Sequence, residues 1–105
     1  HQLQPVLAGD LRPWTGRQPF AGKAPVVLIY VADLARMTRG DADSKAFYSS
    51  VDTGYISQNV YLFCASENLA TVVLGSLDKA ALGQAMRLRP EQKVILTQPV
   101  GYPAD

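Results

Sequence analysis

The strongest hydrophobic pattern in the chain lies in residues 44–68, where apolar side chains recur at steps of three and four positions. This spacing places them on the faces of one long helix, and Asp41 and Asp43 favour its start through the helix dipole. One stripe consists of Phe47, Val51, Tyr55, Gln58, Leu62 and Ala65, and a second apolar face of Tyr48, Ile56, Val60 and Phe63. So much apolar circumference predicts a helix buried on most sides, either central in the domain or shared with another subunit.

β-Branched and aromatic runs predict strands at residues 25–32, 71–74 and 93–98. The first of these runs is continuous, which is typical of a strand buried on both faces. Residues 3–7 alternate weakly and predict a short edge strand, because Pro5 has no amide hydrogen to offer in a central position.

Shorter helical segments complete the pattern. Asp10 is a candidate N-cap for a helix at residues 11–16, and a further helical turn is expected around Phe20. Asp78 is predicted to cap a last helix, which Pro90 ends. Its inward side is predicted to carry Ala81, Leu82, Ala85 and Met86, and its outward side Lys79, Gln84 and Arg87. The order β-α-β-α-β-α-β, with one dominant helix, predicts a layered α+β or α/β domain.

Size and charge limit the possible functions. A chain of 105 residues with 48% hydrophobic positions predicts a single domain over residues 1–105. Ten basic and nine acidic residues give a net charge of +1, and the basic ones are scattered, which argues against nucleic-acid binding. No apolar run reaches the length of a membrane span. The compartment stays open: a cytoplasmic location is favoured, and a signal peptide lost ahead of His1 is the alternative.

Few side chains offer a chemistry of their own. Cys64 is the only cysteine and His1 the only histidine, so no internal disulfide, zinc site or histidine dyad is expected. Cys64 is interpreted as a small buried hydrophobe. Asp52 is interpreted as a cap or salt-bridge partner, and Trp14 as a packing anchor rather than a stacking platform. The serines lack the sequence context of a hydrolase nucleophile.

Two features stay open between a structural and a binding role. Gly75 follows a predicted strand and precedes a helix, so it either supplies a positive φ for a turn or lets a planar cofactor approach the backbone. Gln58 and Asn59 are amides on an otherwise apolar helix, and each needs a partner if it is buried. That partner could be a cofactor, the backbone or a facing helix. Neither a Rossmann nor a Walker glycine motif is present.

Three motifs in register resemble the flavin-dependent nitroreductase superfamily. They are Asp52-Thr-Gly-Tyr-Ile-Ser-Gln-Asn-Val-Tyr-Leu62, then Leu69-Ala-Thr-Val-Val-Leu-Gly75 with Leu77-Asp78, and Pro99-Val-Gly-Tyr-Pro103. Together they span half of the chain. They look most like the branch that includes the thiazoline- and oxazoline-oxidising dehydrogenases of peptide biosynthesis.

The resemblance implies an α+β fold in which a small, mostly antiparallel sheet packs on a long central helix. It implies a homodimer through the 44–68 helix, FMN at the interface, and a ping-pong cycle between NAD(P)H and a small-molecule substrate. The turn at Val73, Leu74 and Gly75 would lie against the flavin ring, with its backbone amides toward N5 and O4. No catalytic side chain is expected, because hydride enters and leaves at N5 of the flavin.

The chain departs from the family pattern where the FMN phosphate would bind. The Arg-rich phosphate-binding motif of such proteins lies near the start of a full-length chain, and nothing like it occurs here. A basic residue in the C-terminal tail is also missing, since the sequence closes on Ala104 and Asp105. The chain is therefore interpreted as the C-terminal half of a nitroreductase-like protein, with the N-terminal half as its partner.

Three functions are compatible with these observations. The leading one is an FMN-dependent NAD(P)H oxidoreductase that acts on a nitroaromatic, a quinone or a peptide azoline. The alternative is a flavin-free dimerisation or interaction module derived from the same fold, which suits a chain without the phosphate motif. A third is a domain that binds flavin without turnover.

Overall fold

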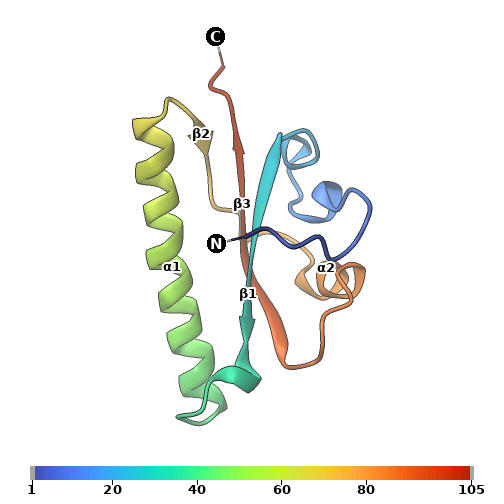
Figure 1. Ribbon diagram of the computed structural model, residues 1–105, viewed down its shortest axis with the longest axis vertical. Coiled ribbons are helices and arrows are strands. Elements are labelled where there is room, and N and C mark those ends of the chain that lie inside the picture. Colours follow the sequence, from blue (N-terminus) through green and yellow to red (C-terminus); the bar gives the residue numbers. More distant parts are fainter. Residues whose placement is uncertain (1, 105) are drawn as a thin grey trace.

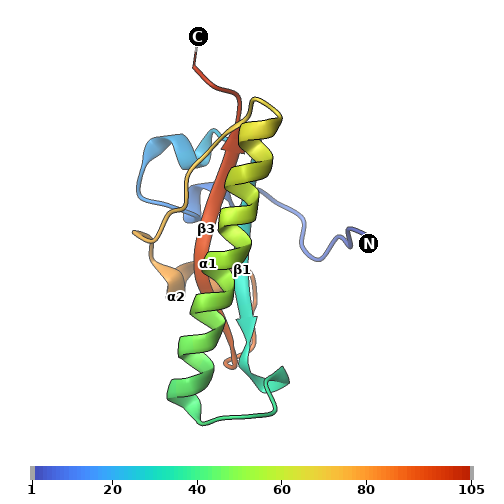
Figure 2. The same ribbon diagram turned by 90° about the vertical axis from the view of Figure 1, so that its left-hand side faces the viewer.

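The fold is an antiparallel three-stranded sheet with one long helix against one of its faces (Figure 1). The computed structural model describes residues 2–104, so expectations that concern His1 and Asp105 lie outside that range. The elements are η1 (Arg12–Trp14), η2 (Pro19–Gly22), β1 (Val26–Asp33), η3 (Leu34–Arg36), α1 (Ala42–Ser66), β2 (Ala70–Thr71), α2 (Lys79–Ala85) and β3 (Gln92–Gly101). Helix α1 runs along one face of the sheet, while α2 and the 3-10 helices η1 and η2 lie on the other side (Figures 1 and 2).

Strand β3 is the centre of the sheet, which has the order β1-β3-β2. It pairs antiparallel with β1 from Val26 opposite Val100 to Asp33 opposite Gln92, with one register shift between these ends. Strand β2 pairs antiparallel with the C-terminal part of β3. The first and the last of the three main predicted strands are therefore confirmed, together with the α+β class and the mostly antiparallel sheet.

Strand β1 is less buried than its continuous apolar sequence predicts. None of its side chains is buried, and Val26 and Val31 are exposed. Strand β1 lies at the edge of the sheet, and α1 and α2 pack mainly on β3 and β2. The prediction that both faces of this strand are covered is therefore wrong within residues 2–104.

Two other predicted strands are shortened or missing. The second main strand is reduced to β2, followed by a separate antiparallel bridge between Leu74 and Thr97. Residues 3–7 form no strand and are exposed. Pro5 removes one amide donor from that short segment, and its weak alternation offers no apolar face that a sheet would bury.

The two helical turns predicted ahead of the sheet are confirmed as the 3-10 helices η1 and η2. Asp10 accepts a hydrogen bond from the Arg12 amide at 3.0 Å, although Leu11 occupies the N-cap position. The Arg12 side chain also bonds this carboxylate and lowers the pKa of Asp10 to about 2. The same guanidinium donates to the carbonyl oxygen of Ala24 at 2.9 Å, which ties η1 to the start of β1.

Helix α1 matches the predicted long helix to within two residues at each end. Asp41 is its N-cap and accepts a hydrogen bond from the Ser44 amide at 2.8 Å, which lowers the pKa of the Asp41 carboxyl. Within residues 2–104, no helix is long and apolar enough to cross a lipid bilayer.

The faces of α1 are not the ones that the hydrophobic pattern predicts. The side chains buried against the sheet are small: Ser49, Thr53, Ser57 and Cys64. The three hydroxyls donate to carbonyl oxygens about one turn earlier in the same helix, so none is left unsatisfied. The large apolar side chains are instead exposed: Phe47, Tyr48, Tyr55, Ile56, Leu62 and Phe63. Within the described chain only this one face of α1 is buried, because small residues, not large ones, allow the close approach to the sheet, so the helix is not central in the domain. The other predicted possibility, a helix shared with another subunit, stays a prediction.

The hydrophobic core lies between α2 and the sheet. Asp78 caps α2 by accepting a hydrogen bond from the Ala81 amide at 3.0 Å, and the predicted inward and outward sides of this helix are confirmed. Helix α2 ends ahead of Arg87, which has a φ of 58°, so a left-handed residue and not Pro90 stops it. The core consists of Leu77, Leu82 and Val94, with Ile29, Met86 and Leu88 packed around them.

Leu82→Ala is expected to destabilise the fold strongly. The Leu82 side chain is 0% exposed, and its removal would leave a cavity under α2, at a cost of about 2–5 kcal/mol in the free energy of unfolding. Leu3→Ala is the matched control, because Leu3 is fully exposed and should change stability by less than about 0.5 kcal/mol. Chemical denaturation of both variants measures the difference. Equal stabilities would contradict this assignment of the core.

Candidate functional site

The segment Val73–Ser76, which joins β2 to the start of α2, is held by hydrogen bonds from three directions. The Val73 amide donates to the Tyr61 hydroxyl on α1 at 2.7 Å. Leu74 and Thr97 exchange two backbone hydrogen bonds, at 2.8 and 3.1 Å. The Ser76 carbonyl accepts a hydrogen bond from the Arg17 amide at 3.2 Å. We refer to Val73–Ser76 as the 73–76 turn.

Two consecutive amides of the 73–76 turn are free. Within residues 2–104, the N–H groups of Gly75 and Ser76 donate to no protein acceptor, and both residues are exposed. Neighbouring free N–H groups of this kind form a ready site for an anion or for acceptor atoms of a ligand. The 73–76 turn is therefore the strongest candidate for a binding function.

Gly75 has no structural reason to be glycine within the described chain. It does not have a positive φ, so the interpretation as a turn residue that needs one is wrong. A Cβ at this position would meet only Leu96 Cδ2, at an ordinary distance of 3.6 Å. The other interpretation of Gly75, as a position that lets a ligand approach the backbone, stays a prediction.

Leu74 is the best-anchored residue of the 73–76 turn. Its side chain is 4% exposed, and it packs so closely on Gly16 that a Cβ there would lie 2.6 Å from Leu74 Cδ1. Thr97 supports it from β3 and donates its hydroxyl to the carbonyl oxygen of the buried Thr15 at 2.5 Å. Of the three residues predicted to face a cofactor, Val73 and Leu74 thus already use their amides, and only Gly75 keeps a free one.

A buried polar network links α1 to the sheet beside this turn. Gln98 is 0% exposed; its Oε1 accepts a hydrogen bond from the Tyr30 hydroxyl, and its Nε2 donates to the Ser57 carbonyl at 3.4 Å. Burial, followed by the nearby Cys64 and Tyr61, raises the pKa of Tyr30. Sequence reasoning missed this network. A glutamine inside a β-branched strand was the one available signal.

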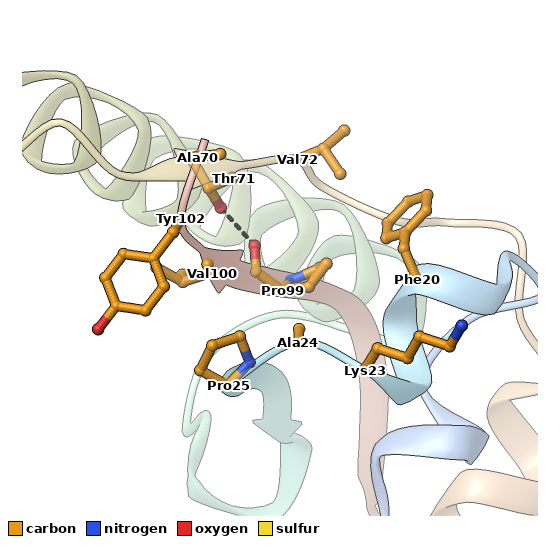
Figure 3. A pocket seen from close by; sticks show the side chains of 11 residues that line it. Phe20, Lys23, Ala24, Pro25, Ala70, Thr71, Val72, Pro99, Val100 and Tyr102 are labelled. Atoms are coloured by element: carbon orange, nitrogen blue, oxygen red, sulfur yellow. Dashed lines mark hydrogen bonds between the residues drawn. The ribbon is translucent and has the colours of Figure 1, made fainter. Parts of the chain in front are cut away.

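A groove of about 350 Å³ is lined in part by Ala70, Thr71 and Val72, which directly precede the 73–76 turn in the chain (Figure 3). It lies between η2, the start of β1, β2 and the C-terminal end of β3, and we call it the Phe20–Tyr102 groove. The Thr71 hydroxyl donates to the Pro99 carbonyl at 2.8 Å along its floor. Lys23 is the only charged side chain among the lining residues, which are Phe20, Lys23, Ala24, Pro25, Ala70, Thr71, Val72, Pro99, Val100, Gly101 and Tyr102.

The other candidate side chains take structural or exposed positions. Cys64 is buried with a free thiol, as interpreted from the sequence, and Asp52 is exposed. Gln58 and Asn59 are exposed too, so neither needs a buried partner within the described chain. Trp14 is half-exposed. Residues 2–104 bring no three side chains of the metal-binding types together.

The chain matches the model of the nitroreductase family over residues 2–102. A candidate nitroreductase of Methanocaldococcus jannaschii is 33% identical over 85 residues, which cover 81% of this chain and 42% of the relative. The chain thus spans less than half of the length of that curated relative.

Solved structures give the same picture. A candidate nitroreductase from Ralstonia eutropha JMP134 superposes with a TM-score of 0.87 at 37% identity, covering 95% of this chain and 48% of that one. The NADPH:FMN oxidoreductase from Vibrio harveyi, crystallised with NAD+, superposes with a TM-score of 0.78 at 23% identity. The superposition covers 90% of this chain and 45% of the Vibrio harveyi chain. It shows that the two share a fold.

Tyr30→Phe is expected to change how stability depends on pH. Because burial raises the pKa of Tyr30 above 10.0, the fold favours the neutral phenol. That stabilisation is complete below pH 10 and is lost as the pH rises through the raised pKa. Replacement by Phe should make the free energy of unfolding fall less steeply at alkaline pH. It should also lower the free energy of unfolding by about 1–3 kcal/mol at neutral pH, because Gln98 Oε1 loses its hydrogen-bond donor.

Denaturation between pH 7 and pH 12 measures both effects. Tyr102→Phe is the control, since it removes a hydroxyl from a side chain that is 80% exposed. An unchanged alkaline profile in Tyr30→Phe would show that Tyr30 does not carry the effect.

Proposed function

The chain belongs to the nitroreductase family, and on that basis we propose that it forms part of an FMN-dependent oxidoreductase. Electrons would come from NAD(P)H and pass to a nitroaromatic, a quinone or a peptide azoline. The Vibrio harveyi neighbour, which has the same fold, is an NADPH:FMN oxidoreductase. The observation that carries the proposal is the pair of free, exposed amides at Gly75 and Ser76 beside a position without a Cβ.

We propose that the flavin ring of FMN lies against the 73–76 turn. Ring atoms N5 and O4 need hydrogen-bond donors, and the Gly75 and Ser76 amides are available donors on an exposed backbone. When bound, FMN would supply hydride acceptance and hydride donation. The chain would contribute fixed N–H dipoles, which favour electron density at the ring edge without adding an acid.

Val73, Leu74 and Gly75 would then have different roles. Gly75 would donate its amide and leave room for the ring. Val73 and Leu74 would hold the backbone in place through their bonds to Tyr61 and Thr97. This division of roles refines the expectation that all three amides face the flavin.

The phosphate of FMN needs a partner that the 73–76 turn does not offer. A phosphate with nearly two negative charges requires Arg, Lys or several amides. We propose that the phosphate-binding groups come from the N-terminal half of the same protein, and that the present chain corresponds to the C-terminal half. The chain covers 42% of one relative and 48% of the other, which fits that division.

We further propose that the chain belongs to the azoline-dehydrogenase branch, which would favour a peptide azoline as substrate. This proposal rests on the three sequence motifs alone.

A homodimer through the 44–68 helix is the second part of the proposal. The outward face of α1 carries large apolar side chains that are more than half exposed, among them Tyr55 at 72% and Leu62 at 59%. Several large apolar side chains exposed on one helix are a candidate interaction site in a folded protein. A second copy of the chain would cover it.

The alternative is a flavin-free dimerisation module built on the same fold. The same outward face of α1 favours it, since dimerisation would need no cofactor. FMN binding separates the two functions. A dimer that binds no FMN, even at saturating concentration, would establish the module.

Gly75→Ala is expected to weaken FMN binding and leave the fold intact. The added Cβ meets only Leu96 Cδ2 at 3.6 Å, so stability should hold. If a flavin lies against this backbone, the methyl group would displace it and raise the dissociation constant at least about tenfold, which is about 1.4 kcal/mol. Flavin absorbance and fluorescence titration of the full protein measure this change.

Gly83→Ala is the matched control for that titration, because a Cβ there meets only Leu88 Cδ1 at 3.9 Å and the position lies on α2, away from the proposed interface. Equal FMN affinity in the two variants would remove the 73–76 turn from the flavin site. Absence of any flavin binding by the unaltered protein would contradict the enzyme proposal itself.

Leu62→Asp is expected to break the proposed dimer. A carboxylate buried without a partner costs several kcal/mol, so the dimer dissociation constant should rise about a hundredfold or more. Ser50→Asp places the same charge at another exposed position of α1 and serves as the control. Sedimentation of both variants measures their oligomeric state. A Leu62→Asp variant that stays a folded dimer would show that α1 is not the interface.

A further inference from the structure

We infer that the open edge of β1 is completed by a further strand, which comes from the N-terminal half of the protein. The inference rests on one part of the proposed function, the existence of that half, and it needs no flavin. Strand β1 lies at the edge of the sheet, and within residues 2–104 its one partner is β3. The side of β1 that faces away from β3 is therefore open to another segment.

The hydrogen bonds of β3 show which backbone groups of β1 face this open side. Thr97 exchanges both of its backbone hydrogen bonds with Leu74, so Ile29, which lies opposite Thr97, bonds to neither of its groups. In an antiparallel ladder the backbone groups of every second residue face the same side of the strand. Val27 and Ile29 therefore face outward. The position of Val27 opposite Pro99, which has no amide hydrogen, agrees with this.

The same alternation continues beyond the register shift. The Leu34 amide donates to the Glu91 carbonyl at 3.0 Å, so Leu34 faces β3, and alternation back along the strand places Val31 outward. Within residues 2–104, the N–H and C=O groups of Val27, Ile29 and Val31 form no hydrogen bond with another protein group. These three residues thus present a row of free donors and acceptors to a neighbouring strand.

Strand β1 lacks the features that protect an open edge from pairing. Folded proteins blunt such edges with Lys, Pro or a bulge in the edge strand. The strand Val26–Asp33 contains neither Lys nor Pro, and its one charged residue, Asp33, is the last and pairs with Arg89. The register shift leaves Ile95 without a partner, so the extra residue lies in β3 and not in β1. An unprotected edge of β-branched residues is a site for strand addition.

The N-terminal half is the occupant that the fold favours. Residues 2–9 run out past β1 on the side away from β3 (Figure 2), so a segment joined ahead of them would enter beside the open edge. The chain covers 42% and 48% of two relatives, which leaves length for such a segment. A second copy suits the edge less well. The proposed dimer already uses α1, and another twofold contact at β1 would extend the assembly beyond a dimer.

Amide hydrogen exchange tests the inference, measured by NMR on the protein with its N-terminal half. With a strand added, the amides of Val27, Ile29 and Val31 should be as protected as those of Leu28 and Tyr30, which face β3 and serve as the internal control. At a free edge the outward amides would exchange at least about tenfold faster than the control amides, after correction for residue type. Such an alternating pattern would overturn the inference.

Nuclear Overhauser contacts in the same protein identify the occupant. We expect cross-strand contacts between the protons of β1 and those of an extended segment in the N-terminal half. Contacts between the β1 strands of two differently labelled copies would assign the edge to a second copy and overturn the inference. A natural coding sequence that holds no N-terminal half would overturn it as well.

Failure of the flavin proposal can be told apart from failure of this inference, because neither measurement needs FMN. FMN binding together with alternating exchange along β1 would keep the enzyme proposal and reject the added strand. Uniform protection along β1 in a protein that binds no FMN would keep the added strand and reject the flavin.

Discussion

The bridge between Leu74 and Thr97 is the constraint on which the candidate site depends. Thr97 lies in the central strand, fully buried, and its backbone exchanges two hydrogen bonds with Leu74 while its hydroxyl reaches the carbonyl of Thr15. One residue therefore joins the sheet, the segment before the sheet and the 73–76 turn. Gly16 packs against Leu74 from the same side, and the close approach leaves no space for a larger residue. With Leu74 fixed, the next two amides point away from protein acceptors.

The inner face of α1 is the second determinant of the structure. A helix packs closely on a sheet only if its contact residues are small, and Ser49, Thr53 and Ser57 meet that need while bonding within their own helix. The large apolar residues of α1 are consequently left on the outside. The same arrangement brings Tyr61 within hydrogen-bond distance of Val73. Helix α1 thus contacts the sheet with its small side chains, exposes its large apolar side chains, and reaches the candidate site through Tyr61.

Local chemistry allowed several elements to be predicted from the sequence. The Asp78 cap, the inward side of α2 and the strand at 93–98 follow from rules that act within a few residues, and all three are confirmed. The orientation of α1 could not be found in this way, because a pattern shows which residues share a face but not which face meets the sheet. The strand predicted at residues 3–7 failed for a related reason, since strand formation depends on a partner.

The sequence could indicate a location for the candidate site, which stays a prediction, but not the geometry found there. The resemblance pointed to Val73, Leu74 and Gly75, and the geometry favours Gly75 together with Ser76 because the other two amides are engaged. Those engagements join Tyr61 to Val73 and Thr97 to Leu74, over separations of 12 and 23 residues that no local pattern encodes. The buried contacts of Gln98 with Tyr30 and Ser57 are long-range in the same sense.

We propose that the free amides of the 73–76 turn face a bound flavin, and an amide-resolved NMR titration of the protein with FMN tests this at the two amides themselves. We expect the resonances of Gly75 and Ser76 to shift first and most, and their hydrogen exchange to slow on binding. Saturable FMN binding that leaves both amides unchanged would contradict the claim and place the flavin elsewhere on the molecule.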